Sequence, residues 1–306
     1  MQFPIVLDGG LSNQLEAQGV DLSHPLWTAQ AVINAPEKII AAHKSYLEAG
    51  AQCIITSSYQ ASIQGFIELG FTHNDAVHLM QQTVLLAKEA VAQYKVDSGD
   101  PSPKYVAASI GPYGASLCDG SEYHGHYDVS RETLVHYHQD RFDALAECGQ
   151  DFYACETIPS REEALVIAEL LEGCNTPAWL CFSCKDKEHI CDGTLLSKAC
   201  LPFAEKQTFF AMGVNCSAPD LISPLVKIIK RICPTKRVVI YPNSGEVYNA
   251  HKKQWSACET PTDFAEQSRH WVEQGVDIIG GCCRIGPDHI RQIERELKRK
   301  QEPVLT

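Results

Sequence analysis

Three cysteines are the residues of this chain whose type and position most readily suggest chemistry. The chain has 14 cysteines, and three of them lie within four residues after short apolar runs: Cys216 after 209–214, and Cys282 with Cys283 after 276–279. Zinc is a borderline-soft ion that cysteine sulfur binds at about 2.3 Å. Three protein ligands would leave a fourth tetrahedral position open, which is the arrangement of catalytic zinc sites. These three cysteines are therefore candidate zinc ligands.

The residues alone leave a second interpretation of the same cysteines open. A buried cysteine usually packs as a small hydrophobic side chain, and three of them could do so near one another. Adjacent side chains on a regular strand point to opposite faces, so Cys282 and Cys283 reach one metal only if the strand ends in an irregular turn. We expect Gly280 and Gly281 to supply the backbone freedom for that turn.

Three other pairs have residue types that bind metals. They are Cys181/Cys184, His124/His126 and His136/His138. The cysteine pair lies at positions i and i+3 of a predicted strand end, where side chains face opposite ways, so we expect packing. The first histidine pair lies in a predicted loop, and the second in a predicted helix where i and i+2 share no face. We expect solvated or hydrogen-bonded histidines.

Two carboxylates also follow predicted strands. Asp8 comes after the first apolar run and Glu156 after the fourth. One interpretation makes them a helix cap and a loop charge. The other makes them a pair that binds a substrate ammonium group, because charge-assisted hydrogen bonds are strong where water is excluded.

Eight short apolar runs that alternate with amphipathic segments would position these residues. The runs are 4–7, 52–56, 105–110, 151–155, 178–182, 209–214, 237–241 and 276–279, and the helices that follow them are 36–49, 74–94, 131–148, 161–171, 197–206, 219–232, 262–274 and 287–298. This pattern predicts parallel strands covered by helices. We expect a single-domain (β/α)8 barrel of the TIM type over residues 1–300, with a C-terminal tail at 301–306. The sites would then gather at the carboxyl ends of the strands.

An open doubly wound sheet is the alternative fold, but the first turn, Asp8–Asn13, lacks a G-x-G-x-x-G phosphate-binding sequence. The net charge of −12 argues against a nucleic-acid partner. We see no signal peptide, and no apolar run reaches the roughly 18–20 residues that span a membrane. We expect a cytoplasmic protein without a membrane partner, with its cysteines reduced. A monomer is compatible with the sequence, which leaves the oligomeric state open.

Several strand-end strings resemble the homocysteine S-methyltransferase family. They are Leu7-Asp8-Gly9-Gly10, Thr56-Ser57-Ser58-Tyr59-Gln60-Ala61-Ser62, Glu156-Thr157, Gly213-Val214-Asn215-Cys216, Tyr241-Pro242-Asn243-Ser244-Gly245 and Gly280-Gly281-Cys282-Cys283. They occur in the family's order and run through nearly the whole chain. The single cysteine after Gly-Val-Asn and the later Gly-Gly-Cys-Cys are the most specific of them.

The resemblance implies an enzyme that methylates the thiol of homocysteine and forms methionine in a zinc-binding (β/α)8 barrel. The family's three zinc ligands correspond to Cys216, Cys282 and Cys283. Its carboxylates for the homocysteine amino group correspond to Asp8 and Glu156. Further substrate contacts are expected from Ser57, Tyr59 and Asn243.

The partners implied are homocysteine and a sulfonium methyl donor. The 56–60 segment and the short chain most resemble the enzymes that use S-methylmethionine, with S-adenosylmethionine as another sulfonium donor. Betaine users typically have a long C-terminal extension, and cobalamin-dependent enzymes have further large modules. The alternatives are a betaine- or other-donor methyltransferase for a thiol or selenol, and a non-catalytic barrel that binds a ligand.

Overall fold

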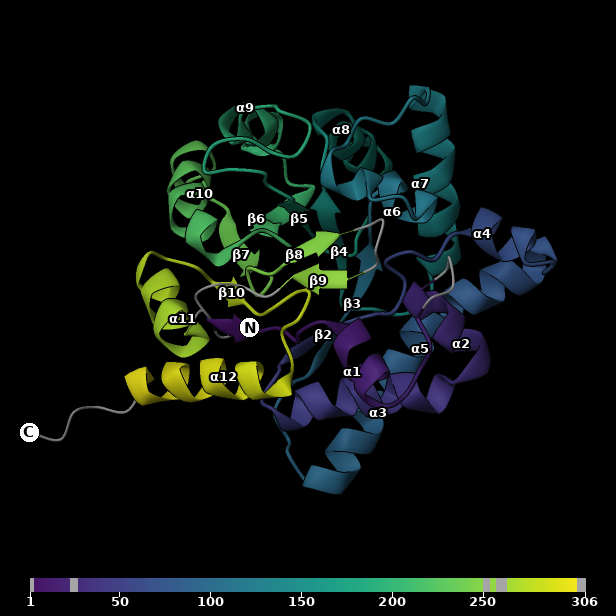
Figure 1. The fold of residues 1–306 in the computed structure, drawn as a ribbon, viewed down its shortest axis with the longest axis horizontal. Coiled ribbons are helices and arrows are strands. Elements are labelled where there is room, and N and C mark those ends of the chain that lie inside the picture. The colour runs from purple at the N-terminus through teal and green to yellow at the C-terminus, as the bar shows by residue number, and fades with distance from the viewer. Residues whose placement is uncertain (1–2, 23–26, 250–253, 257–262, 302–306) are drawn as a thin grey trace, which may run out of the picture.

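The computed structural model describes residues 3–22, 27–249, 254–256 and 263–301. Eight parallel strands form one sheet in the order β1-β10-β7-β6-β5-β4-β3-β2, with helices around it (Figure 1). The strands are β1 (Ile5–Val6), β2 (Cys53–Ile55), β3 (Tyr105–Ile110), β4 (Phe152–Ile158), β5 (Ala178–Phe182), β6 (Phe209–Asn215), β7 (Arg237–Tyr241) and β10 (Ile278–Ile279). Each predicted apolar run overlaps one of these strands, although β4 and β6 extend beyond their runs.

The two edges of this sheet meet, so the predicted (β/α)8 barrel is confirmed. A parallel bridge pairs Leu7, just after β1, with Cys53 of β2. On either side of it, the amide of Asp8 donates to the Cys53 carbonyl (3.1 Å) and the amide of Gln52 donates to the Val6 carbonyl (2.7 Å). The seam between β1 and β2 is therefore held by fewer ladder bonds than the other strand pairs.

Each of the eight predicted helices has a counterpart. They are α3 (Pro36–Glu48), α5 (His73–Ser98), α7 (Arg131–Leu145), α8 (Arg161–Leu170), α9 (Leu196–Cys200), α10 (Pro219–Ile232), α11 (Phe264–Glu273) and α12 (Pro287–Gln301). Capping residues and prolines in the sequence explain where several of these helices begin. Thr72 and Asp75 form a capping box at α5, and Pro36 and Pro219 stand in the first turns of α3 and α10.

Short elements that we did not predict follow several of the strands. They are α1 (Leu11–Ala17), η1 (Trp27–Ala29), α2 (Gln30–Asn34), α4 (Ile63–Glu68), α6 (Tyr113–Leu117), η2 (Ser121–Tyr123), η3 (Leu201–Phe203) and the antiparallel hairpin of β8 (Val247–Asn249) and β9 (Gln254–Ser256). Most of them lie in βα connections, where a barrel builds its site. Within the described residues, no helix is long and apolar enough to cross a membrane. The predicted tail includes 302–306, which lie outside the described residues.

The core has two layers, as expected for a small closed barrel. One cluster of buried side chains fills the barrel interior and includes Leu7, Phe152 and Trp179. A larger cluster lies between the strands and the surrounding helices. The interior of the barrel is therefore packed, and open space is found at its end.

Candidate active site

A cavity of about 870 Å³ opens at the carboxyl ends of the strands. Its wall combines residues that follow β1, β2, β6 and β10 with residues near the ends of β4 and β7 and residues from the connection between β3 and α7. Among them are Asp8, Tyr59, Glu122, Glu156, Cys216, Cys282 and Cys283. The chain thus brings most of the predicted site residues to one place, although they are far apart in sequence.

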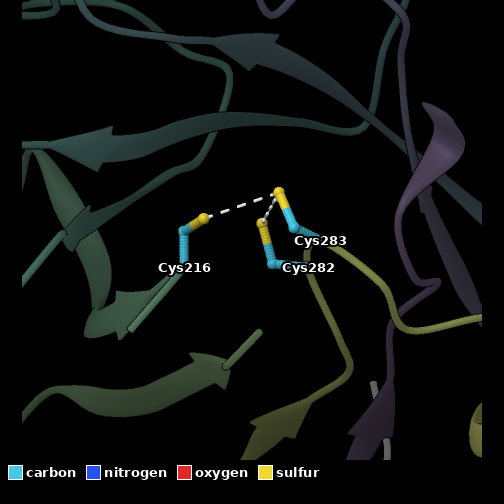
Figure 2. Close-up of side chains that lie close together, drawn as sticks. All are labelled: Cys216, Cys282 and Cys283. Atoms are coloured by element: carbon cyan, nitrogen blue, oxygen red, sulfur yellow. Dashed lines mark hydrogen bonds between the residues drawn. The ribbon is translucent and has the colours of Figure 1, made fainter. Parts of the chain in front are cut away.

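Cys216, Cys282 and Cys283 point their sulfur atoms toward one another (Figure 2). The Sγ of Cys283 lies 3.7 Å from that of Cys216 and 4.0 Å from that of Cys282. A tetrahedron with zinc–sulfur bonds of about 2.3 Å has sulfur–sulfur edges of about 3.8 Å. These two separations match a zinc site, and all three sulfur atoms lie within 4.8 Å of one another. Within the described part of the chain, this is the group of metal-binding side chains whose ligand atoms lie close enough to share an ion.

The end of β7 holds both cysteine-bearing loops. The amide of Cys216 donates to the Tyr241 carbonyl (3.1 Å), and the amide of Cys282 donates to the Pro242 carbonyl (2.8 Å). Cys216 has a φ of 45°, a left-handed conformation that costs a non-glycine residue roughly 1–2 kcal/mol. Strain of this kind is typical of functional positions, where the surrounding structure imposes the side-chain direction.

The irregular turn that we expect before Cys282 and Cys283 is present. The expectation that its two glycines supply unusual backbone conformations is wrong. β10 ends at Ile279, and neither Gly280 nor Gly281 has a positive φ. Their role is close approach: a Cβ on Gly280 would lie 2.6 Å from the Asp8 carbonyl oxygen, and one on Gly281 would lie 2.1 Å from a methyl carbon of Ile285. Gly280 lets the cysteine loop approach the loop after β1, and Gly281 lets the same loop fold back against Ile285.

Asp8 lies at the seam of the barrel and is 2% exposed. Its Oδ2 accepts a hydrogen bond from the Ile55 amide (2.8 Å), so the carboxylate connects the loop after β1 to β2. Burial raises the pKa of Asp8 well above its usual range, and the nearby charge of Glu156 raises it further. A positively charged group bound between these two carboxylates would relieve both effects.

Glu156 lies inside β4, which continues to Ile158; our predicted end at residue 155 was therefore too early. The pairing of β4 with β5 shifts register between Cys155 and Ile158, and Thr157 has a φ of 58°. The Asn215 side chain holds this irregularity, because its Oδ1 accepts from the Thr157 amide (2.6 Å) and its Nδ2 donates to Thr157 Oγ1 (2.7 Å). The register shift is a β-bulge, which re-aims side chains and here leaves Glu156 on the cavity wall.

The Glu156 carboxylate is buried, and its ionisation depends on the groups around it. It accepts a hydrogen bond from the Ser109 hydroxyl. Burial raises the pKa of Glu156 to about 7, against the lowering effect of that hydrogen bond. The group therefore lies close to its titration point at neutral pH, and a bound cation would favour its ionised form.

The three other predicted substrate contacts have different positions. Tyr59 lines the cavity, where burial and the charge of Glu122 hold its pKa above the usual range. Ser57 is 1% exposed, and the Asn243 side chain accepts from the Gly245 amide (2.9 Å). Neither is among the described residues of the cavity wall. Their substrate contacts remain predictions that this arrangement does not favour.

Sequence reasoning missed the residues that the connection between β3 and α7 brings to the cavity. Glu122 and Tyr123 come from η2, next to the predicted loop of His124 and His126. One carboxylate oxygen of Glu122, Oε2, is buried without a hydrogen-bond partner. Burial raises the pKa of Glu122 to about 7. An acidic residue in the loop after a barrel strand was the available signal.

The cavity wall has one sign of charge. Its acidic side chains are Asp8, Glu16, Asp21, Glu122 and Glu156, and no Lys, Arg or His is among the described residues of the wall. Hydrogen bonds with Cys282 and Cys283 hold the pKa of the Cys216 thiol well below its ordinary value. A cavity of this kind attracts cations and disfavours anions.

The other cysteine and histidine pairs do not form metal sites with the described residues. Cys181 packs in the barrel interior and Cys184 in the outer layer, so the two share no site. His138 is buried with its Nε2 2.9 Å from Glu163 Oε1. The rings of His124 and His126 stack at 6.0 Å.

Comparisons with known proteins find methyltransferases for homocysteine or selenocysteine. A family model described as homocysteine S-methyltransferase matches residues 5–297. The chain is 43% identical to homocysteine S-methyltransferase 2 of Zea mays, covering 96% of this chain and 90% of the relative. It is 39% identical to a selenocysteine methyltransferase of Astragalus bisulcatus, covering 98% and 94%. The metallated form of the homocysteine methyltransferase MmuM from Escherichia coli superimposes with a TM-score of 0.86 at 35% identity, covering 96% of each chain.

Proposed function

The chain belongs to the homocysteine S-methyltransferase family, and on that premise we propose that it transfers a methyl group from a sulfonium donor to homocysteine at a zinc site formed by Cys216, Cys282 and Cys283. S-Methylmethionine is the donor proposed first, and S-adenosylmethionine second. The homocysteine thiol gives up its proton to solvent, its sulfur attacks the methyl carbon, and the carbon–sulfur bond of the donor breaks. With S-methylmethionine, both products are methionine.

The observation that carries this proposal is a thiol cluster in a cavity whose described charged residues are all acidic. A sulfonium donor that also has an ammonium and a carboxylate group carries a net positive charge at neutral pH. Betaine carries none, because its carboxylate balances its ammonium. The acidic wall therefore favours a sulfonium donor over betaine.

The residues of the site have separate tasks in this proposal. Cys216, Cys282 and Cys283 would hold the metal, which when bound supplies a positive centre that favours the ionised, nucleophilic form of a substrate thiol. Asp8 and Glu156 would bind the ammonium group of homocysteine and thereby orient its sulfur toward the cysteines. Tyr59 would contribute to the wall around the reacting groups. Positioning of two reactants in this way accounts for a large part of the catalysis of a displacement reaction.

The test is methionine formation from homocysteine with S-methylmethionine as the only donor, with and without a zinc chelator. We expect turnover that the chelator removes. Cys216→Ser should lose tightly bound zinc and turnover together, whereas Cys174→Ser, at an exposed position, should retain both. Full zinc content and full rate in Cys216→Ser would refute the metal assignment. A zinc-loaded enzyme without turnover would refute S-methylmethionine as donor.

A second candidate substrate is a selenol. The support for it is the similarity to the selenocysteine methyltransferase of Astragalus bisulcatus over nearly the full length of both chains. Competition between homocysteine and selenocysteine for a limiting amount of donor would measure the preference. A preference for selenocysteine would make the selenol the principal substrate.

A further inference from the structure

Glu122 is a cavity residue that the proposed mechanism does not yet use. It lies in η2, in the connection between β3 and α7, and reaches the cavity from a different segment than Asp8 and Glu156. Those two carboxylates have protein partners, the Ile55 amide and the Ser109 hydroxyl. The buried Oε2 of Glu122 has none.

This position is unfavourable for a carboxylate as long as the cavity holds no cation. A buried oxygen without a hydrogen-bond donor loses its hydration and gains nothing in return. The charges that act on Glu122 come from Cys216 and Asp119, and both have the same sign as the carboxylate. No described residue of the cavity wall supplies a positive charge. Three thiolates outweigh the charge of a bound zinc ion, so the cysteine site also stays negative, and a positive partner for Glu122 would have to enter with a ligand.

The fold holds Glu122 in this place through the segments around it. Tyr113 and Tyr127, which flank the η2 turn, both donate to the buried carboxylate of Glu163, the amide of Tyr113 at 2.5 Å and the hydroxyl of Tyr127 at 2.9 Å. A Cβ on Gly114 would lie 2.7 Å from the Glu122 amide nitrogen, so α6 packs directly against the turn. These contacts hold the turn that carries Glu122 in place beside the cavity.

We propose that Glu122 recognises the positive charge of the methyl donor, with its carboxylate against the sulfonium centre. A sulfonium has no N–H or O–H, so it is bound by charge and contact instead of hydrogen bonds. The Oε2 of Glu122, which receives no hydrogen bond and lines the same cavity as the thiols, suits such a cation. Tyr59 and Tyr123 also line the cavity, and aromatic rings favour cations. This inference rests on the proposed function and adds the residue that selects the donor.

The chemistry predicts which kinetic constant Glu122 controls. The donor loses its positive charge as the methyl group leaves, so attraction to a carboxylate is stronger before the transition state than in it. Such an interaction serves binding and specificity instead of rate. Glu122→Gln should raise the KM for the donor and leave kcat unchanged or slightly higher.

The experiment compares two ligands that differ only in charge. S-Methylmethionine is a substrate, and 2-amino-5-methylhexanoic acid replaces its positive sulfur by a neutral carbon in the same skeleton. Dissociation constants for both are measured by calorimetry on the wild-type enzyme and on Glu122→Gln. We expect the wild type to prefer the sulfonium by about tenfold or more, and Glu122→Gln to lose most of that preference. Glu132→Gln, an exposed position on α7, is the matched control and should retain it.

Two further measurements separate the possible outcomes. Binding of homocysteine should be unchanged in Glu122→Gln, which also shows that the variant is folded, and Glu122→Asp should recover part of the preference because it restores the charge. A preference retained in Glu122→Gln would overturn the inference about Glu122 and leave the proposed function standing. A wild-type enzyme that binds both ligands equally would overturn recognition of a sulfonium donor altogether.

Discussion

Replacement of Asp8 by Asn removes one charge from the site with little change in shape. The Oδ2 of Asp8 accepts from the Ile55 amide at 2.8 Å, and an asparagine oxygen can keep that bond. Its amide group then stands where the second carboxylate oxygen would meet the ammonium group of homocysteine. A hydrogen bond to a charged group contributes about 1.5–3 kcal/mol, so its loss corresponds to a roughly 10- to 150-fold weaker binding. The ammonium does not change during the reaction, and we therefore expect a higher KM for homocysteine with kcat preserved.

Steady-state kinetics with two thiols test this reasoning. The second thiol is 4-mercaptobutanoic acid, which is homocysteine without its amino group. The wild-type enzyme should prefer homocysteine strongly, and Asp8→Asn should lose most of that preference while its zinc content and its KM for the donor stay the same. An unchanged KM for homocysteine at full zinc content would refute the assignment of Asp8. An equal rise in KM for both thiols would mean that the substitution damages the site as a whole.

Two further predictions concern the supports of the site and of the fold. In Gly10→Ala the new Cβ would lie 2.8 Å from the Cys282 carbonyl oxygen, so we expect weaker zinc binding. Competition with a chromophoric chelator measures it. The control Gly286→Ala, whose Cβ would have no neighbour closer than 3.9 Å, should bind zinc normally. His43 is fully buried on α3, neither ring nitrogen has a partner, and burial lowers its pKa from 6.5 to about 4. Between these two values the unfolded chain binds one more proton than the folded one, so stability should fall by about 3 kcal/mol as the pH drops from 6.5 to 4. His43→Leu should remove that part of the pH dependence in urea denaturation, and an unchanged slope would contradict the assignment.

The fold could be predicted from sequence because its strands are short, apolar and separated by helices. The bounds of β3, β5 and β7 agree with the predicted runs, since a glycine, a proline or a polar or charged residue directly flanks each end of them. The end of β4 does not agree with its predicted run, because Glu156 and Thr157 are polar and yet belong to the strand. The Asn215 side chain of another strand holds that segment in place, and no local pattern indicates such a contact.

The site was predictable where residues directly follow a strand, and less so elsewhere. Cys216 and Cys282 come one to three residues after their strands, so barrel topology alone brings them together. Ser57 also follows a strand, but it is buried away from the cavity wall. Glu122 was missed because its direction depends on α6 and on the buried Glu163, which comes from the helix after β4. Tertiary contacts between distant segments decide such positions.

The seam between β1 and β2 has a consequence for how this barrel moves. The ring is closed there by the single bridge between Leu7 and Cys53, and the Asp8 carboxylate adds one bond across it to the Ile55 amide. Amide protons at this seam should therefore exchange with deuterated solvent sooner than those of β3 to β6, because fewer bonds must break to expose them. A ligand whose ammonium group restrains Asp8 would slow that exchange. The isotope content of residues 53–55 would then report occupancy of the site without any label on the ligand.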